Sequence, residues 1–397
     1  MKFSIVKKEL KKYLDNIKKS RAFSKTDDYV VLKIVVKDGS VDFICSNIGI
    51  WACSSIVDNV EIESDGEVYV DGTNFINIVE TYPQDAMLVF SEEKEKDGKV
   101  RLLLQYTDRK QEKQSAFLLI TPDYFEDAPP NEDQKEVVVD TKSFVQAAKA
   151  VGFASSSHEL ERWMWGALIE VYDTDDISAF ATDRSRIAWY DPKGFDYKRD
   201  KEFRLLNPIY PCLYPVLDCL DIKKDTQITY GENYTILKQD SQWHAIPNAI
   251  ESRNEDDVLP DWRVLHKHLL EAIQTKISIN KKALLQCIKT ASYTSCKKYG
   301  LRFFIDTDNK EIVLAVDSTE VGGILKSYHK EKYTIDDNDI SGEAFKGEIM
   351  MSVNSLKEDI EQINSDKITF CLIDDNSPMI IHGDESEHLK IIATGLE

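Results

Sequence analysis

A strand followed directly by a helix recurs three times along the chain at a nearly constant interval. The copies are MKFSIVKKELKKYLDNIKK from residue 1, VVVDTKSFVQAAKAVGF from residue 137, and ISINKKALLQCIKTASYTSCKK from residue 277. Their starts are therefore 136 and 140 residues apart, whereas solenoid repeats are about 20–50 residues long. The interval indicates duplicated domains.

A related unit lies between these copies, and it also occurs three times. Residues 68–90, 205–230 and 349–372 each read as strand, helix, polar turn and strand. Six strand–helix units in three pairs, separated by β-rich sequence, predict an α+β protein of three similar domains, each with two helices packed on β-sheet. The polar stretches near 127–136 and 266–276 separate the predicted domains at 1–130, 137–266 and 276–397.

Basic residues are concentrated in two of the repeated helices, although the chain is acidic overall. Residues 1–21 hold eight Lys or Arg and two acids, and residues 277–298 hold five Lys and no acid. These segments together carry a charge of +11. Because the net charge of the whole chain is −20, the remaining residues carry −31. Lysines on a single helix face are ordinarily solvated. Their recurrence in corresponding helices favours a polyanionic partner such as nucleic acid.

Several other classes of protein lack their usual signals. No run of about 18 apolar residues and no secretory leader is present, so we expect an intracellular protein. The seven cysteines include no CxxC pair, which predicts reduced thiols, no zinc site and no cofactor. No phosphate-loop, dinucleotide, zinc-protease or serine-hydrolase motif occurs, so no enzyme is predicted. His266 and His268 are expected to be exposed, and the DTDD stretch at 173–176 is expected to be a hairpin turn.

Four stretches, in order, resemble the bacterial DNA polymerase III beta sliding clamp family. They are MKFSIVKKEL, VYVDGTNFINIVETYP, GALIEVYDTDDISAFATDRSRIAWY at 166–190, and VLPDWRVL at 258–265. The third is similar to the strand, acidic turn and ATDGHRLA signature of the family. The resemblance implies a homodimeric ring around duplex DNA, with helices lining the hole and β-sheet outside. Such a ring slides on DNA, tethers the polymerase and catalyses no reaction.

A size argument is consistent with a dimer. An α-helix with its side chains is roughly 10–12 Å across. Six helices in a circle leave a hole of roughly 10 Å, and twelve leave about 28 Å at the same spacing. B-DNA, with grooves about 8.5 and 7.5 Å deep, is about 20 Å across. Six helices per chain therefore require two chains to enclose a duplex.

Helix spacing and the resemblance together give the predicted DNA contacts. A sliding protein should contact phosphates rather than base edges, and lysines on a helix face can do so. His158 and Arg162 match family positions that touch DNA, although the residue types differ. The predicted contacts are Lys8, Lys12, Lys19, Arg21, Lys142, Lys149, His158, Arg162, Lys282 and Lys289.

The resemblance also implies one groove that binds short peptides of the polymerase alpha subunit, the clamp loader and repair proteins. Apolar walls with Arg nearby suit a peptide with hydrophobic anchors. Carried over by motif, its residues are Trp163, Met164, Thr182, Arg186, Ile187, Pro260, Arg263, Val264, Val353 and Ile391.

The chain departs from the family pattern at several positions. Arg184–Ser185 replaces Gly-His, the tail IIATGLE lacks the usual aliphatic-Pro-aliphatic run, and Tyr293–Thr294 replaces an apolar pair at the dimer contact. DWRVL is one residue shorter than the family stretch, which leaves the role of Arg263 open. These departures suggest a divergent, accessory or mobile-element clamp. A clamp-fold scaffold that binds peptides without encircling DNA remains the alternative.

Overall fold

The computed structural model covers the 397-residue chain. It describes every residue except 21–29, 48, 95–98, 108–111, 128–131, 157–163, 165, 195–202, 209–212, 249–261, 295–300, 320–324, 376, 385–387 and 394–397. The fold divides into two compact units. Unit 1 comprises Met1–Val145 and Asn207–Asn248, and unit 2 comprises Gln146–Leu206 and Ala249–Glu397. The division falls within the second predicted domain, residues 137–266. The boundaries of the three domains remain a prediction.

Unit 1 contains two antiparallel sheets. One has the order β5-β1-β7-β8-β9 and is formed by β1 (Lys2–Val6), β5 (Val60–Ser64), β7 (Met87–Lys94), β8 (Val100–Thr107) and β9 (Glu112–Leu118). The other has the order β10-β15-β16-β17-β4-β3-β2-β6. Its strands are β2 (Val31–Lys37), β3 (Ser40–Asn47), β4 (Ile50–Ile56), β6 (Gly66–Asp71), β10 (Lys135–Asp140), β15 (Asp225–Tyr230), β16 (Tyr234–Gln239) and β17 (Gln242–Pro247).

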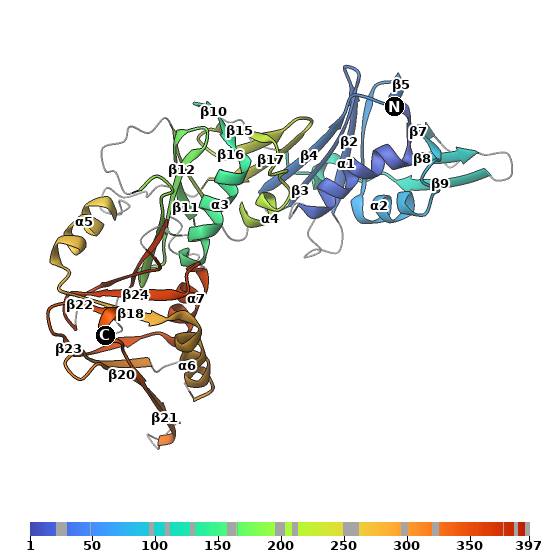
Figure 1. Ribbon diagram of the computed structural model, residues 1–397. Helices are drawn as coiled ribbons and strands as arrows, with labels where there is room; N and C mark the ends of the chain where they lie inside the picture. The colour runs from blue at the N-terminus through green and yellow to red at the C-terminus, as the bar shows by residue number, and fades with distance from the viewer. Residues whose placement is uncertain are drawn as a thin grey trace. The chain divides into compact units, whose positions relative to one another are not determined.

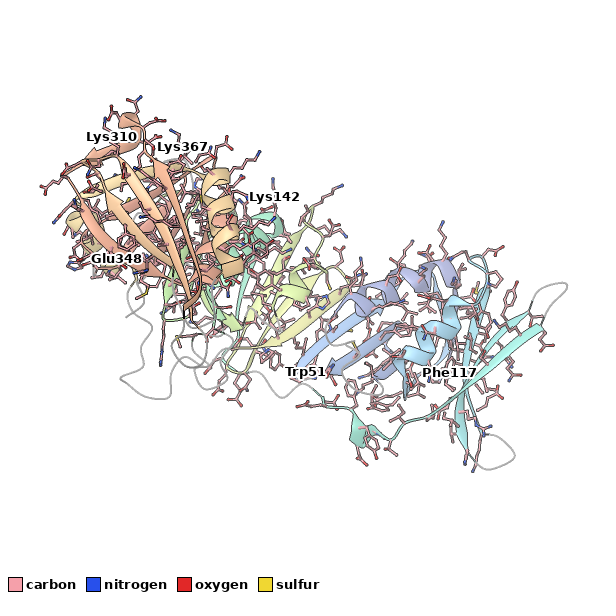
Figure 2. The ribbon with its side chains drawn as sticks, turned by 90° about the horizontal axis from the view of Figure 1, so that it is seen from below. Trp51, Phe117, Lys142, Lys310, Glu348 and Lys367 are labelled. Carbon is pink, nitrogen blue, oxygen red and sulfur yellow. The ribbon has the colours of Figure 1, made fainter. Side chains whose placement is uncertain are left out.

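The helices α1 (Lys7–Lys19) and α2 (Gly72–Glu80) pack against each other and contribute to the core of unit 1 (Figure 1). The predicted apolar stripe of α1 is confirmed, because Leu10, Leu14 and Ile17 are all buried. Aromatic rings fill the space beside α2. The ring centroid of Phe75 lies 5.2 Å from that of Phe117 in β9, which is labelled in Figure 2. Burial of this stripe leaves the opposite side of α1 free for charged residues.

Unit 2 is built on a nine-stranded and a four-stranded sheet. The first has the order β14-β11-β12-β13-β26-β25-β24-β18-β22. Its strands are β11 (Gly166–Asp173), β12 (Asp176–Thr182), β13 (Arg186–Tyr190), β14 (Phe203–Pro208), β18 (Thr275–Asn280), β22 (Ile340–Gly342), β24 (Lys367–Leu372), β25 (Met379–His382) and β26 (Leu389–Ala393). The second has the order β21-β20-β19-β23 and comprises β19 (Leu301–Asp306), β20 (Glu311–Thr319), β21 (Leu325–Thr334) and β23 (Lys346–Met351).

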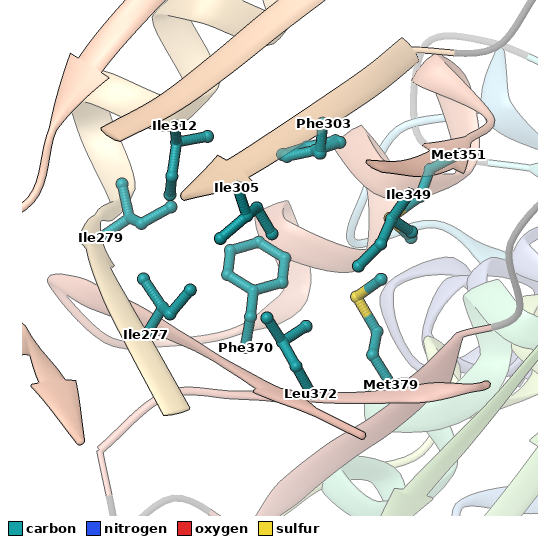
Figure 3. A pocket seen from close by; sticks show the side chains of 10 residues that line it. All are labelled: Ile277, Ile279, Phe303, Ile305, Ile312, Ile349, Met351, Phe370, Leu372 and Met379. Atoms are coloured by element: carbon teal, nitrogen blue, oxygen red, sulfur yellow. The ribbon is translucent and has the colours of Figure 1, made fainter. Parts of the chain in front are cut away.

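Side chains from both sheets of unit 2 form one apolar core (Figure 3). Ten side chains surround a space of only about 10 Å³, roughly the minimum volume that holds one water molecule. All ten are apolar, so this space is tightly packed core and offers no polar group to a ligand. They are Ile277, Ile279, Phe303, Ile305, Ile312, Ile349, Met351, Phe370, Leu372 and Met379.

The six predicted strand–helix units are present. β1, β6, β10 and β18 run straight into α1, α2, α3 (Thr141–Val151) and α6 (Lys281–Thr294), and β23 leads into α7 (Val353–Gln362). β14 precedes α4, which is described over Tyr214–Leu217. Most of the junctions have a local cause, because a side chain just before the helix caps it, although Val6 before α1 forms no side-chain cap. Asp140 and Asn280 accept hydrogen bonds from the backbone N–H groups of Ser143 and Ala283, at 2.7 and 3.0 Å.

The polar stretch that was predicted to separate the second and third domains is not an open connection. Residues 262–272 form α5 (Trp262–Ala272), and His266 is fully buried, so its predicted exposure is wrong. Two other expectations are confirmed. Asp173 pairs with Asp176 at the turn between β11 and β12, and the five cysteines within the described ranges are free thiols. Among the described residues, no helix combines the length and the apolar character needed to cross a membrane.

Candidate nucleic-acid interface and partner pocket

Exposed lysines occupy the same position in three of the repeated helices. Lys8, Lys142 and Lys282 are the second residues of α1, α3 and α6, and all three side chains are exposed. Figure 2 shows Lys142 on α3. Their ammonium groups form no ion pair with any carboxylate in the part of the chain that the structure describes. The helices therefore present cations that are available to a solvent-side anion.

The remaining predicted lysines are exposed as well. Lys149 and Lys289 are the ninth residues of α3 and α6, and Lys19 ends α1. Lys12 is exposed, but its Nζ lies 2.6 Å from Glu9 Oε2 on the preceding turn. A surface pair of this kind contributes little stability. A phosphate can therefore displace Glu9 from Lys12 at little cost.

The first lysine of two helices has a structural role instead. Lys7 is buried and donates from Nζ to the backbone oxygen of Glu80, at 3.4 Å, where α2 ends. Lys281 donates in the same way to the backbone oxygens of Glu361 and Ile363, where α7 ends. A cation at a helix C-terminus satisfies carbonyl groups that have no partner within the helix. Lys7 and Lys281 thus hold α1 and α6 to the neighbouring helices α2 and α7, whereas Lys8 and Lys282 face outward.

Helices α6 and α7 also form an open groove of about 520 Å³. Its charged lining comprises four lysines and two acids, a net charge of +2, and its remaining lining residues are Leu285 and Gln286. The charged residues are Lys281, Lys282, Lys289, Lys357, Glu361 and Asp366. A positive groove between two helices suits a phosphate chain, because lysines attract phosphates without reading the sequence.

The predicted partner pocket begins at the turn between β12 and β13. Asp183 Oδ1 accepts hydrogen bonds from the backbone N–H groups of Ser185 and Arg186, each at 3.1 Å, and Thr182 donates to the backbone oxygen of Arg186 at 2.8 Å. Arg184 has φ = 76°, the left-handed conformation that favours glycine. The arginine that replaces the family's glycine is therefore held in a costly conformation by the surrounding turn.

Arg186 is buried beneath this turn and does not face a solvent-side ligand. Its guanidinium donates to Asp183 at 3.0 Å, to Glu358 at 2.7 Å and to Asp359 at 2.8 Å. It also donates to the backbone oxygens of Phe153 and Ser355. Burial raises the pKa of Asp359 to about 7, although the nearby Arg186 opposes this shift. Arg186 thus ties β13 to α7, while the sequence had placed it in the pocket wall.

The strand register decides which aliphatic side chains share the pocket face. Ile187 of β13 lies opposite Ile392 of β26, and Ala188 lies opposite Ile391. Because neighbouring residues of a strand point to opposite faces, Ile391 lies on the other face from Ile187. Ile391 is fully buried there, and Ile392 takes its place beside Ile187.

Two further predicted wall residues are also core residues, since Met164 and Val353 are 1% and 5% exposed. Five predicted site residues lie outside the described residues: Arg21, His158, Arg162, Trp163 and Pro260. Thr182 is also only 5% exposed. Of the predicted wall residues that the structure describes, Ile187 lies where α5 packs on the sheet, and α5 carries Arg263 and Val264.

Helix α5 lies on the face of the sheet that carries Ile187. Arg263 forms an ion pair with Glu170 of β11 and also contacts the hydroxyl of Tyr172. Val264, in contrast, is 50% exposed. Sequence reasoning missed Glu170 and Tyr172, although a carboxylate within the apolar stretch GALIEVY was a signal that a cation lies nearby. Arg263 thus has its role in holding α5 to the sheet.

Comparison with known proteins identifies the fold of this chain. No family model matches the chain. The curated beta sliding clamp of Synechococcus elongatus is 21% identical over 265 residues, which are 66% of this chain and 65% of that protein. The matched region thus spans slightly less than two thirds of the relative. The solved DNA polymerase III subunit beta of Pseudomonas aeruginosa superposes with a TM-score of 0.79 at 14% identity, and each chain is covered completely. The chain has the sliding-clamp fold.

Two other solved clamps agree with this assignment. The DNA polymerase sliding clamp of Caulobacter crescentus gives a TM-score of 0.77 at 14% identity, and the beta subunit of Streptococcus pyogenes gives 0.73 at 17% identity. In both cases the match covers 100% of each chain. The likeness to these solved clamps thus extends over the whole of the compared chain, although few of its residues are identical to theirs.

Proposed function

We propose that the protein is a sliding clamp that encircles duplex DNA as a homodimeric ring. In this proposal the helices face the DNA, the polymerase alpha subunit and the clamp loader bind at the partner pocket, and the chain itself catalyses no reaction. It acts in the cytoplasm of a bacterial cell. The observation that carries the proposal is the recurrence of an exposed lysine at the second position of α1, α3 and α6.

The arrangement of charge supports contact with phosphates. The chain has a net charge of −20, yet its first helices carry exposed lysines at matching positions. An evenly acidic surface would repel DNA. Lysines at repeated positions attract phosphates by releasing counterions and read no sequence. This is the type of contact that permits sliding.

Two sheet ends support the dimer. β9 is the last strand of one sheet of unit 1, and β21 is the last strand of the four-stranded sheet of unit 2. Unpaired sheet edges readily add a strand from another chain. We propose that β9 of each copy pairs with β21 of the other, which closes a ring after two copies. Leu118 at the end of β9 is 65% exposed, and Tyr293 on α6, which packs against β20 and β21, is 79% exposed. Both offer apolar surface to such a contact.

The DNA assignment is tested by reversing charge at the repeated position. We expect the triple variant Lys8→Glu, Lys142→Glu, Lys282→Glu to bind duplex DNA more weakly than the unchanged protein at every salt concentration. If each lysine contacts one phosphate, the slope of log K against log salt should fall in magnitude by about 5 per dimer. The assay is fluorescence anisotropy of a labelled duplex across a salt series, with circular dichroism to verify folding.

A matched control carries the same change of charge elsewhere. Lys37, Lys238 and Lys310 are exposed lysines on strands and turns, and their triple Glu variant should keep most of the salt slope. If both triple variants lose the slope equally, the helices are not the DNA-binding surface. If the protein stays monomeric at high micromolar concentration in a mass series, the alternative of a scaffold that does not encircle DNA is favoured.

A further inference from the structure

A hollow of about 450 Å³ lies on one face of the eight-stranded sheet of unit 1, and it contains none of the residues assigned above to DNA or to peptides. It spans β10, β15, β16 and β17, which are consecutive neighbours in this sheet (Figure 1). Eight of its nine lining residues belong to these strands and occupy alternate positions, which point to one face. Ligand pockets typically have volumes of about 300–1,000 Å³. The hollow is therefore large enough to hold a side chain of a partner protein.

Apolar and aromatic side chains form the floor and one wall of the hollow. Ala245 pairs with Ile236 and is fully buried, whereas Ile236 itself is partly exposed. Trp243, two residues before Ala245 on the same face, is also partly exposed. Tyr234 lines the hollow as well, and its ring centroid lies 5.8 Å from that of Trp51, which is labelled in Figure 2. The short side chain of Ala245 among these larger ones makes the face concave.

One carboxylate of the hollow is held in a fixed orientation. Glu136 Oε2 accepts a hydrogen bond from Gln227 Nε2 at 3.2 Å, and Glu136 Oε1 accepts one from Thr229 Oγ1 at 3.4 Å. Within the described ranges, no cation pairs with this exposed carboxylate. Because each carboxylate oxygen can accept two hydrogen bonds, both oxygens can still accept from a further donor. Glu136 thus offers a negative charge to a ligand.

The other charges near the hollow differ in sign between its two sides. Lys238 lies two strands and two residues away from Glu136, so their Cα atoms are roughly 12 Å apart. On the other side, Glu132 and Glu232 are exposed, and the backbone N–H of Glu232 donates to the backbone oxygen of Glu132 at 3.1 Å. The whole chain carries a net charge of −20. A basic partner is therefore attracted to this face, and an acidic partner is repelled.

We propose that the hollow binds an arginine side chain of a partner protein. The guanidinium group donates to the two oxygens of Glu136, and the methylene groups of the arginine cover Ile236 on the floor. Arginine suits this arrangement because its planar head can pair with both oxygens of one carboxylate. Its aliphatic stem can at the same time lie along apolar surface. Charge complementarity thus identifies the occupant as a basic segment of a protein.

The start of α3 lies on the opposite face of the same sheet. Gln239 follows Lys238 in β16 and therefore points to that opposite face. Its Nε2 donates to Oγ1 of Thr141, the first residue of α3, at 3.0 Å. A partner in the hollow leaves Lys142 accessible, and the inference does not depend on the proposed DNA and peptide contacts.

The test is fluorine NMR of the full-length protein labelled with fluorinated tryptophan. Trp243→Phe identifies the resonance of Trp243 among those of the six tryptophans. N-acetyl-arginine methylamide is titrated as the probe, and N-acetyl-citrulline methylamide, which has nearly the same shape but no charge, is the matched ligand. We expect the arginine probe to shift the resonance of Trp243 in a saturable way and to bind about fivefold more tightly than the citrulline probe, since only arginine forms the ion pair.

Two variants remove charges of opposite sign from the hollow. In Glu136→Gln the preference for arginine over citrulline should fall below about twofold, because the ion pair is lost. Lys238→Gln is the matched control, and its preference should stay within about twofold of that of the unchanged protein, since this charge is distant and screened by salt. Both positions are exposed, and unchanged resonances of the other tryptophans verify folding.

Three results would overturn the inference. The arginine probe leaves the resonance of Trp243 unshifted at every concentration, the two probes bind the unchanged protein equally well, or Glu136→Gln retains the full preference for arginine. None of these results bears on DNA binding or on enclosure of DNA, so failure of this inference is distinguishable from failure of the proposed function.

Discussion

Replacement of Arg186 by Met should destabilise unit 2 strongly, because it removes the cation that pairs with the buried carboxylate of Asp359. Arg186 is 6% exposed and lies between Asp183, Glu358 and Asp359, the last of which is 1% exposed. Met keeps much of the side-chain volume but donates no hydrogen bond. Removal of one partner from a buried ion pair costs about 3–5 kcal/mol, since the other charge stays in the interior without compensation. We expect a loss in that range at pH 8.

The assay is urea unfolding followed by tryptophan fluorescence, since Trp189 lies three residues from Arg186 and is itself buried. Arg302→Met is the matched control. Arg302 lies 3.8 Å from Glu348, and both side chains are about one third or more exposed. An exposed pair of this kind contributes less than about 1 kcal/mol. If Arg186→Met costs no more than Arg302→Met, the buried Arg186–Asp359 pair does not stabilise unit 2, and our reasoning about Arg186 is wrong.

The same cluster makes a second, pH-dependent test possible. Burial raises the pKa of Asp359 from 3.8 to about 7, so the folded protein holds this proton more tightly than the unfolded chain does. The contribution of Asp359 to stability is therefore greatest below about pH 4 and is lost as the pH rises through about 7. In Asp359→Asn the side chain can still accept from Arg186 but cannot ionise. This variant should gain stability relative to the unchanged protein between pH 5 and pH 8, and a constant difference would contradict the assignment.

Three further predictions concern α5, the pocket and the core. Burial and the nearby Lys390 lower the pKa of His266 to about 3, so its contribution to stability is fully present above about pH 6.5 and is lost towards pH 3; His266→Leu should flatten this part of a stability–pH curve. Ile187→Asp should weaken peptide binding at least a hundredfold in an anisotropy titration, because it places a charge at an apolar anchor site, whereas Val57→Asp at a site 62% exposed should not. Phe370→Ala should lower the free energy of urea unfolding by about 3–5 kcal/mol, because it empties part of the apolar core in Figure 3.

The parts of the fold that were predictable depend on local sequence. The junctions of β1 with α1, β10 with α3 and β18 with α6 fall where the repeat placed them, since each depends on the local periodicity of apolar residues. At the last two, a capping side chain lies within the same few positions. The exposure of Lys8 and Lys282 followed from the same helix periodicity.

The parts that were missed depend on residues far apart in the sequence. Lys7 and Lys8 have the same side-chain type, and only the end of α2, more than 70 residues later, shows that Lys7 is buried as a cap. Ile391 and Ile392 differ only in the register of β26 against β13, which lies about 200 residues earlier. A shift of one residue in that register exchanges the two faces of the strand.

Helix α5 illustrates the same limit. Its stretch HKHLLEAIQTK is polar enough to resemble a connection, and it becomes a docked helix because a row of apolar residues from four different strands receives Leu269. That row is assembled by β13, β24, β25 and β26, and no segment of the sequence displays it on its own.

The central claim is enclosure of DNA, and the lifetime of the protein on circular and on cut DNA tests it most directly. The protein is loaded by its cognate clamp loader onto a nicked circle at moderate salt, loading is verified, and the circle is then cut by a restriction enzyme. Cross-linking the two chains beforehand prevents opening of a weak dimer interface. We predict that the protein persists on the circle and leaves rapidly after the cut, because a ring held by topology slides off a free end. Equal lifetimes on the two forms would show that contacts rather than enclosure hold the protein, and would contradict the clamp mechanism.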